Sequence, residues 1–211
     1  MDWSVVIPVK RLSLAKTRLR GGLPGVPHDD LVLSLAADTV AAALSCPMVT
    51  AVFVVTDEPL VRQTVTELGA EPITDVPDAG LNPALEHGAD QAIRRRPECG
   101  VVALGGDLPA LRPGELADAL DAARNHPRAY VCDVERTGTV LLAARPGSRL
   151  GPRFGPGSAR AHRDSGAVEL VGDWPTLRRD VDTAGDLVAA AALGLGRHTA
   201  GRLPRPSGPV W

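Results

Sequence analysis

Short, continuous apolar runs alternate with segments of helical periodicity along most of this chain. The apolar runs cover residues 5–9, 51–56, 101–104, 130–134 and 140–143. Strands of a parallel sheet have this composition, because helices cover both of their faces and leave no polar side. The helical segments between them cover residues 30–45, 59–68, 83–95 and 113–125. This alternation predicts an α/β fold with a mostly parallel sheet and helices on both faces.

The length of the chain predicts one domain. A chain of 211 residues, 44% of them hydrophobic, can bury one sizeable core. Glycine and proline interrupt the alternation at residues 145–163, although Ser158 could begin a helix there. A last helix is expected from Thr183 within residues 182–195. We therefore expect a domain at residues 1–196 and a poorly ordered tail rich in Gly, Pro and Arg at residues 197–211.

Charge and composition argue against several classes of protein. A net charge of −2 does not favour a surface for nucleic acids. No segment reaches the roughly 18 apolar residues of a membrane span, and no secretory signal precedes the first strand. We expect a cytoplasmic protein with neither a nucleic-acid nor a membrane partner. The cysteines are three and widely spaced, which favours buried free thiols over a metal site: Cys46, Cys99 and Cys132.

Basic side chains directly follow the first predicted strand. Lys10, Lys16 and Arg18 lie in one short loop, within the stretch IPVKRLSLAKTRL. Ligands of parallel α/β sheets bind beyond the carboxyl ends of the strands. Lysine as a point charge and arginine as a bidentate donor suit the phosphates of a nucleotide. The loop is therefore predicted to bind phosphates, with solvated loop charges as the alternative; it contains no Walker motif.

Carboxylates at two other places predict a magnesium site. Asp107 follows the strand at 101–104 after two glycines, and its carboxylate is a hard oxygen ligand of the kind that Mg²⁺ takes. Asp180 and Asp182, in RDVDTAGD, could supply the second ligand. The structural alternatives are that Asp107 caps the helix beginning near Pro113 and that Asp182 is the N-cap of the last helix.

Two further segments offer polar groups near helix starts. Asn82, in GLNPAL, could present its amide to the edge of a base, or could be an N-cap before Pro83. The stretches RTGTV and FGPGSARAH offer hydroxyls and free backbone N–H groups, which predicts an anion site.

The motifs IPVKRLSLAKTRL, GLNPAL, GGDLPAL, GTVLLAA, FGPGSARAH and DVDTAGDL together resemble the guanylyltransferases of coenzyme F-420 biosynthesis. The resemblance covers residues 3–195. It implies a single-domain, Rossmann-like nucleotidyltransferase that uses Mg²⁺. Such an enzyme transfers GMP from GTP to a three-carbon phosphate, with phosphoenolpyruvate favoured over 2-phospho-L-lactate, and releases pyrophosphate.

The resemblance also implies a role for each matching residue. Lys10, Lys16 and Arg18 would hold the GTP phosphates, and Asn82 would lie near the nucleotide. Asp107 with Asp182 would hold Mg²⁺. Gly155 and Ser158 would bind the acceptor. Related sequences commonly have a second threonine where this chain has Val140, so Thr139 or backbone N–H groups would have to serve there.

The expected mechanism is in-line attack of an acceptor phosphate oxygen on the α-phosphorus of GTP, without a general base. The five histidines are therefore expected to be surface or structural residues: His28, His87, His126, His162 and His198. Two other functions remain open at this point. One is a nucleotidyltransferase for a sugar phosphate or a molybdopterin-type acceptor, and the other is a non-catalytic nucleotide-binding module. The basic tail from Arg197 could bind a downstream enzyme that takes a labile product.

Overall fold

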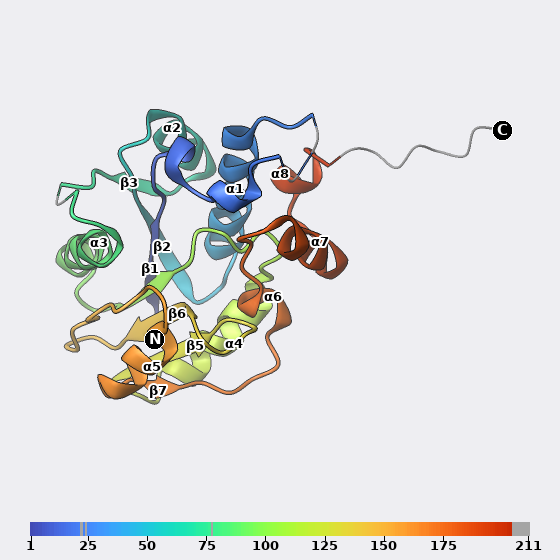
Figure 1. Cartoon of the computed structure of the whole chain (residues 1–211). Coiled ribbons are helices and arrows are strands. Elements are labelled where there is room, and N and C mark those ends of the chain that lie inside the picture. Colours follow the sequence, from blue (N-terminus) through green and yellow to red (C-terminus); the bar gives the residue numbers. More distant parts are fainter. Residues whose placement is uncertain (22, 24, 77, 204–211) are drawn as a thin grey trace.

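The strands form one mixed sheet in the order β3-β2-β1-β4-β6-β5-β7. The structure is a computed structural model that describes residues 1–21, 23, 25–76 and 78–203 (Figure 1). Strand β6 runs antiparallel to β4 and β5, and the other neighbouring pairs are parallel. The strands are β1 (Trp3–Pro8), β2 (Val49–Val55), β3 (Glu71–Ile73), β4 (Gly100–Leu104), β5 (Arg128–Cys132), β6 (Thr139–Ala144) and β7 (Val168–Glu169).

Helices cover both faces of the sheet, as the alternation predicts. Along β1, Val5 and Ile7 pack in one apolar cluster with α1 and α4, whereas Val6 packs with α3 on the opposite face. Figure 1 shows α1 and α3 on opposite sides of β1. The helices are α1 (His28–Leu44), α2 (Pro59–Leu68), α3 (Leu81–Arg95), α4 (Pro113–Ala123), α5 (Ser158–Asp164), α6 (Pro175–Arg178), α7 (Ala184–Leu193) and α8 (Arg197–Ala200), with 3-10 turns η1 (Leu12–Leu14) and η2 (Thr17–Leu19).

Two N-caps differ from the sequence prediction. The N-cap of α7 is Thr183, whose hydroxyl and the Asp186 carboxylate form a capping box, so the alternative that Asp182 caps this helix is wrong. The N-cap of α3 is Gly80, with a φ of 104°, so Asn82 lies within the first turn and is not a cap. Aspartate and asparagine both favour N-cap positions, but here Thr183 and Gly80 occupy them, and the side chains of Asp182 and Asn82 make other contacts.

The short edge strands β3 and β7 were not predicted. They span three and two residues, too few for a period-2 pattern to be recognised. β3 and β7 are strands because their backbones pair with the neighbouring strands β2 and β5.

Residues 197–203, which the sequence analysis assigns to the tail, include helix α8 and contact α1. The buried Asp38 carboxylate of α1 accepts the backbone N–H groups of His198 and Thr199 at 2.9 and 2.8 Å. It thereby satisfies two N–H groups at the start of α8. Arg202 also pairs with Asp30 of α1. The rest of the predicted tail, residues 204–211, lies outside the described residues.

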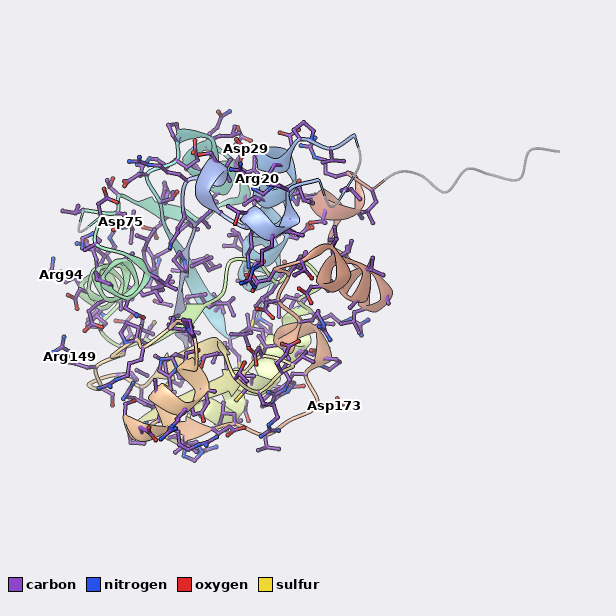
Figure 2. The ribbon with its side chains drawn as sticks, viewed as in Figure 1. Arg20, Asp29, Asp75, Arg94, Arg149 and Asp173 are labelled. Carbon is purple, nitrogen blue, oxygen red and sulfur yellow. The ribbon has the colours of Figure 1, made fainter. Side chains whose placement is uncertain are left out.

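The cysteines lie where the sequence predicts them, and charged side chains lie at the periphery. The three cysteines are buried and free, as predicted. Charged side chains such as Arg94, Arg149 and Asp173 point outward at the periphery (Figure 2). In the ranges that the structure covers, no helix combines the length and the apolar character needed to cross a bilayer.

The packing of α3 on the sheet predicts opposite effects of alanine at two helical glycines. A Cβ at Gly88 would lie 2.5 Å from Val6 Cγ1 and 2.6 Å from Val55 Cγ2, whereas one at Gly114 in α4 would meet nothing within 4 Å. Gly88→Ala should lower the free energy of unfolding by about 1–3 kcal/mol through overpacking. Gly114→Ala should leave it unchanged or raise it by up to about 1 kcal/mol. Urea denaturation of both variants tests this, and equal effects would contradict the packing described.

Candidate active site

A large cavity opens at the carboxyl ends of β1 and β4. Its volume is about 790 Å³, within the usual range for a small-molecule site. From β1 the strand order continues to β2 and β3 on one side and to β4 on the other. Ligands of α/β sheets bind in the crevice at such a reversal of order. The lining comes from the loop after β1, the loop after β4, the β5–β6 turn, the stretch before α5 and the stretch before α7.

Glycines bring the loop after β4 close to β1. A Cβ at Gly106 would lie 3.0 Å from the carbonyl oxygen of Pro8, and one at Gly105 would lie 2.9 Å from Asp107 Oδ1. The loop is fixed further on by the backbone N–H of Leu108, which donates to Thr39 Oγ1 at 2.9 Å. Larger side chains at the two glycines would therefore displace Asp107 from the end of β1.

The structure brings Asp107, Asp180 and Asp182 together as an acidic cluster. Ligand oxygens of the three carboxylates lie within 4.8 Å of one another. The backbone N–H of Val181 donates to the Asp107 carbonyl at 3.1 Å, which joins the two segments. The Lys16 ammonium donates to both the Asp107 and the Asp182 carboxylates. Asp107 does not cap α4, whose N-cap is Arg112.

The other two predicted cations lie on the same cavity. Lys10 and Arg18 are exposed and line it, one on each side of Lys16 along the loop. Among the described residues, neither forms an ion pair. Lys16 has a left-handed backbone, with φ of 50° and ψ of 42°. Such a conformation costs about 1–3 kcal/mol in a non-glycine residue and marks sites where neighbouring contacts hold it.

The residues predicted to bind the acceptor lie on the same cavity. Thr139, Gly155 and Ser158 all line the cavity. Ser158 is 2% exposed, and its hydroxyl has no hydrogen-bond partner within the described part of the chain. Val140 packs in the apolar core and its carbonyl accepts the Gly105 N–H at 2.9 Å, so the hydroxyl on this strand end comes from Thr139.

Asp133 is a cavity residue that the sequence analysis missed. Its carboxylate accepts the backbone N–H groups of Thr137 and Gly138 at 2.9 and 2.7 Å. A Cβ at Gly138 would lie 2.2 Å from Asp133 Oδ2, so this turn needs glycine. The signal was present in the spacing of an aspartate before Thr-Gly, which is typical of side chains that hydrogen-bond nearby backbone.

The structure gives Asn82 a different contact from the one expected. Its amide donates to the Phe154 carbonyl at 3.0 Å and accepts the Phe154 N–H at 2.7 Å. Both ends of the amide are thus bonded to the backbone of the segment 153–158, which we call the acceptor loop. Asn82 does not line the cavity, and in this structure its amide holds the acceptor loop against α3.

A smaller pocket of about 220 Å³ adjoins the cavity on the β2 side. The two share Pro8, Val9, Lys10 and Leu81. Three carboxylates line the smaller pocket and lie within 4.8 Å of one another: Asp57, Asp75 and Asp78. Figure 2 labels Asp75 on the loop between β3 and α3. The backbone N–H of Asp75 donates to Asp57 Oδ1 at 3.2 Å, and that of Asp78 donates to Asp75 Oδ1 at 3.3 Å.

A family model described as "Guanylyl transferase CofC like" matches residues 3–203 of the chain. The chain belongs to this guanylyl transferase family. Two relatives are phosphoenolpyruvate guanylyltransferases. The one from Salinispora arenicola is 58% identical over 201 residues, covering 94% of this chain and 92% of that protein. The one from Geodermatophilus obscurus is 58% identical over 214 residues, covering 98% and 97%. The resemblance inferred from the motifs is thereby confirmed.

Solved structures agree with the fold. A nucleotidyl transferase from Methanothermobacter superposes with a TM-score of 0.58 at 16% identity, covering 91% of this chain and 97% of that chain. At this identity the likeness supports the fold alone. The Rossmann-like nucleotidyltransferase fold predicted for this CofC-like protein is therefore confirmed, while the roles of individual residues rest on the geometry above.

The electrostatics of the acidic cluster suit a divalent cation. Burial, and then the nearby Asp107 carboxylate, raise the pKa of Asp180 to about 7. For Lys16, burial opposes the charged form, but Asp107 and Asp182 outweigh it and raise the pKa of the ammonium. Three carboxylates around one ammonium leave an excess of negative charge on hard oxygen atoms. These residues fit Mg²⁺, and Asp180 joins the predicted ligands Asp107 and Asp182.

Asp180 should destabilise this CofC-like protein at neutral pH when no metal is bound. Its pKa is about 7 in the folded chain against an ordinary value of 3.8, so the unfolded chain loses the proton first. This group's contribution to stability therefore falls as the pH rises from about 4 to about 7. In metal-free protein at pH 8, Asp180→Asn should raise the free energy of unfolding by about 1–3 kcal/mol, and below pH 4 the gain should vanish.

Thermal unfolding across this pH range, with and without Mg²⁺, measures both effects. Wild-type protein should gain more stability from Mg²⁺ than the Asp180→Asn variant does. Asp173→Asn, an exposed carboxylate at the periphery, is the matched control and should change neither quantity. An Asp180→Asn variant that is less stable than wild type at pH 8 would contradict the inference that the ionised Asp180 carboxylate destabilises the folded protein.

Proposed function

We propose that this protein transfers a guanylyl group from GTP to phosphoenolpyruvate and releases pyrophosphate. The observation that carries the proposal is the composition of one cavity. Lys10, Lys16 and Arg18, the three carboxylates of the acidic cluster, and the hydroxyl residues Thr139 and Ser158 all line it. Family membership and relatives named phosphoenolpyruvate guanylyltransferase support the same reaction.

The cations would hold the triphosphate. Lys10 and Arg18, which pair with no described carboxylate, can neutralise the phosphate oxygens, and Lys16 brings further positive charge beside Asp107. Mg²⁺ held by the acidic cluster would supply the additional charge neutralisation that a displacement at phosphorus requires. The site thus acts by positioning and electrostatics, and nothing in it must serve as a nucleophile.

The acceptor supplies its own nucleophile. Its phosphate is ionised at neutral pH, so an oxygen can attack the α-phosphorus without a general base. The new bond joins that oxygen to the α-phosphorus, and the bond from the α-phosphorus to the bridging oxygen of the β-phosphate breaks. The electron pair leaves with pyrophosphate. The Thr139 and Ser158 hydroxyls, which also line the cavity, would bind the acceptor's phosphate or carboxylate.

Pyrophosphate release with separate acceptors tests the proposal. With Mg²⁺ and GTP, release should depend on phosphoenolpyruvate and should be slower with 2-phospho-L-lactate and 3-phosphoglycerate. Asp107→Asn should reduce turnover at least about 100-fold while the fold is retained, because it removes a carboxylate that bonds Lys16 and lies in the acidic cluster. Asp173→Asn is the control. Pyrophosphate release only with a sugar phosphate would favour a nucleotidyltransferase for that acceptor. GTP binding without any release would favour a non-catalytic nucleotide-binding module.

We place the nucleoside in the smaller pocket, because it adjoins the cavity at Lys10 and Asn82 is engaged elsewhere. Guanine presents N1–H and N2–H groups, which a carboxylate can accept as a pair, whereas adenine presents an acceptor at N1. Asp57, directly after β2, is the carboxylate proposed for this contact.

Inosine triphosphate lacks the 2-amino group and therefore tests the contact with guanine. Wild-type protein should prefer GTP to ITP by about tenfold in kcat/KM, and Asp57→Asn should abolish most of that preference. The asparagine oxygen can still accept the Asp75 N–H, so the pocket should keep its shape. An unchanged ratio of GTP to ITP would place guanine recognition elsewhere.

A further inference from the structure

We propose that His162 is a positioning residue that makes the Thr139 hydroxyl a hydrogen-bond donor to the acceptor substrate. The inference rests on the proposed function, because it names the group that prepares the acceptor side of that site. His162 lies on α5, four residues after Ser158, and its side chain is fully buried. It does not line the cavity itself.

Both ring nitrogens of His162 are hydrogen-bonded. Nδ1 lies 2.9 Å from Thr139 Oγ1, and Nε2 lies 2.9 Å from the backbone nitrogen of Arg153. The ring also packs against the aromatic rings of Tyr130 and Phe154, with centroid distances of 5.9 and 5.1 Å. Its position is therefore fixed from several sides.

These contacts determine where the proton lies. A backbone N–H can only donate, so Nε2 must be an acceptor and cannot carry a proton. Burial, with the positive charges of Arg128 and Arg153, lowers the pKa of His162 to about 4, so the ring is neutral at physiological pH. The single ring proton is then on Nδ1, which donates to Thr139 Oγ1.

Thr139 is left with one proton to donate. Its oxygen accepts from His162, and its own O–H finds no acceptor among the described residues. Thr139 lines the cavity, so an acceptor atom of a ligand can take this proton. Phosphate and carboxylate oxygens are such acceptors and offer no competing donor when ionised. Because the ring donates to the Thr139 oxygen, the hydroxyl proton is not used in the contact with His162 and is available to an anionic substrate.

His162 also connects Thr139 to the acceptor loop. It accepts the N–H of Arg153 at one end of that loop, while Asn82 bonds the backbone of Phe154 next to it. Ser158 lies at the other end of the loop, at the start of the helix that carries His162. The buried ring therefore links the strand end that carries Thr139 to the loop and helix that carry Ser158.

Two amide substitutions separate the two contacts of the ring. In His162→Asn the amide nitrogen can reach the position of Nδ1 and keep a donor to Thr139. In His162→Gln the amide oxygen can reach the position of Nε2 and keep an acceptor for Arg153, while the donor to Thr139 is lost. Thr139→Val and Thr139→Ser form the matched pair that removes or keeps the hydroxyl.

Steady-state kinetics with GTP and phosphoenolpyruvate measure the effects. His162→Gln and Thr139→Val should each raise the acceptor KM by about tenfold or more and change the GTP KM less than about twofold. His162→Asn and Thr139→Ser should have smaller effects on the acceptor KM. The double variant His162→Gln/Thr139→Val should be no worse than either single variant, because both remove the same contact. Circular dichroism confirms that each variant is folded.

Three results would overturn the inference. The first is a His162→Gln variant that raises the KM values of GTP and the acceptor equally, or raises neither. If His162→Gln does not fold, the same result with Thr139→Val counts. The second is an effect of His162→Gln that adds in full to that of Thr139→Val. The third is wild-type protein that releases no pyrophosphate with any acceptor, which would overturn the proposed function together with this inference. An active wild type with either of the first two results would overturn the inference alone.

Discussion

The site depends on the crowding of three carboxylates around the Lys16 ammonium. Asp107 comes from the end of β4, and Asp180 and Asp182 come from the segment before α7. Without a cation between them, the mutual repulsion of these groups would push the two segments apart. Lys16 bonds Asp107 and Asp182, while burial, and then the nearby Asp107 carboxylate, raise the pKa of Asp180. The loop after β1 is thereby held over the ends of the strands, where Lys10 and Arg18 can meet phosphates.

The backbone around this cluster makes the crowding possible. Gly105 and Gly106 allow the loop after β4 to approach β1, and the Val181 N–H joins the second acidic segment to the Asp107 carbonyl. On the acceptor side, the β5–β6 turn is ordered by Asp133 and the acceptor loop by Asn82. Asp133 and Asn82 thus fix two loops beside the cavity through hydrogen bonds to the backbone, while other side chains remain available to ligands.

Much of the fold and of the site could be predicted because its signals are local. The apolar runs locate the central strands, and the motifs place Lys16 in the loop after β1, Asp107 in the loop after β4 and Asp182 before α7, where parallel topology gathers them. Contacts between distant segments could not be predicted. The sequence gives no reason for Asn82 to bond Phe154, for Asp38 to accept the N–H groups of α8, or for His162 to face Thr139, since each partner lies far along the chain. The edge strands β3 and β7 are too short to leave a pattern.

The identity of the product shows directly whether the cavity joins the guanylyl group to the acceptor. Purified protein would be incubated with Mg²⁺, GTP and phosphoenolpyruvate and followed by ³¹P NMR and mass spectrometry. We expect free pyrophosphate and a new diphosphate, with two mutually coupled phosphorus signals and a mass equal to phosphoenolpyruvate plus GMP less one water. Conversion of GTP to free GMP and pyrophosphate with phosphoenolpyruvate unchanged would contradict it, because the cavity would then activate the α-phosphorus without holding the acceptor.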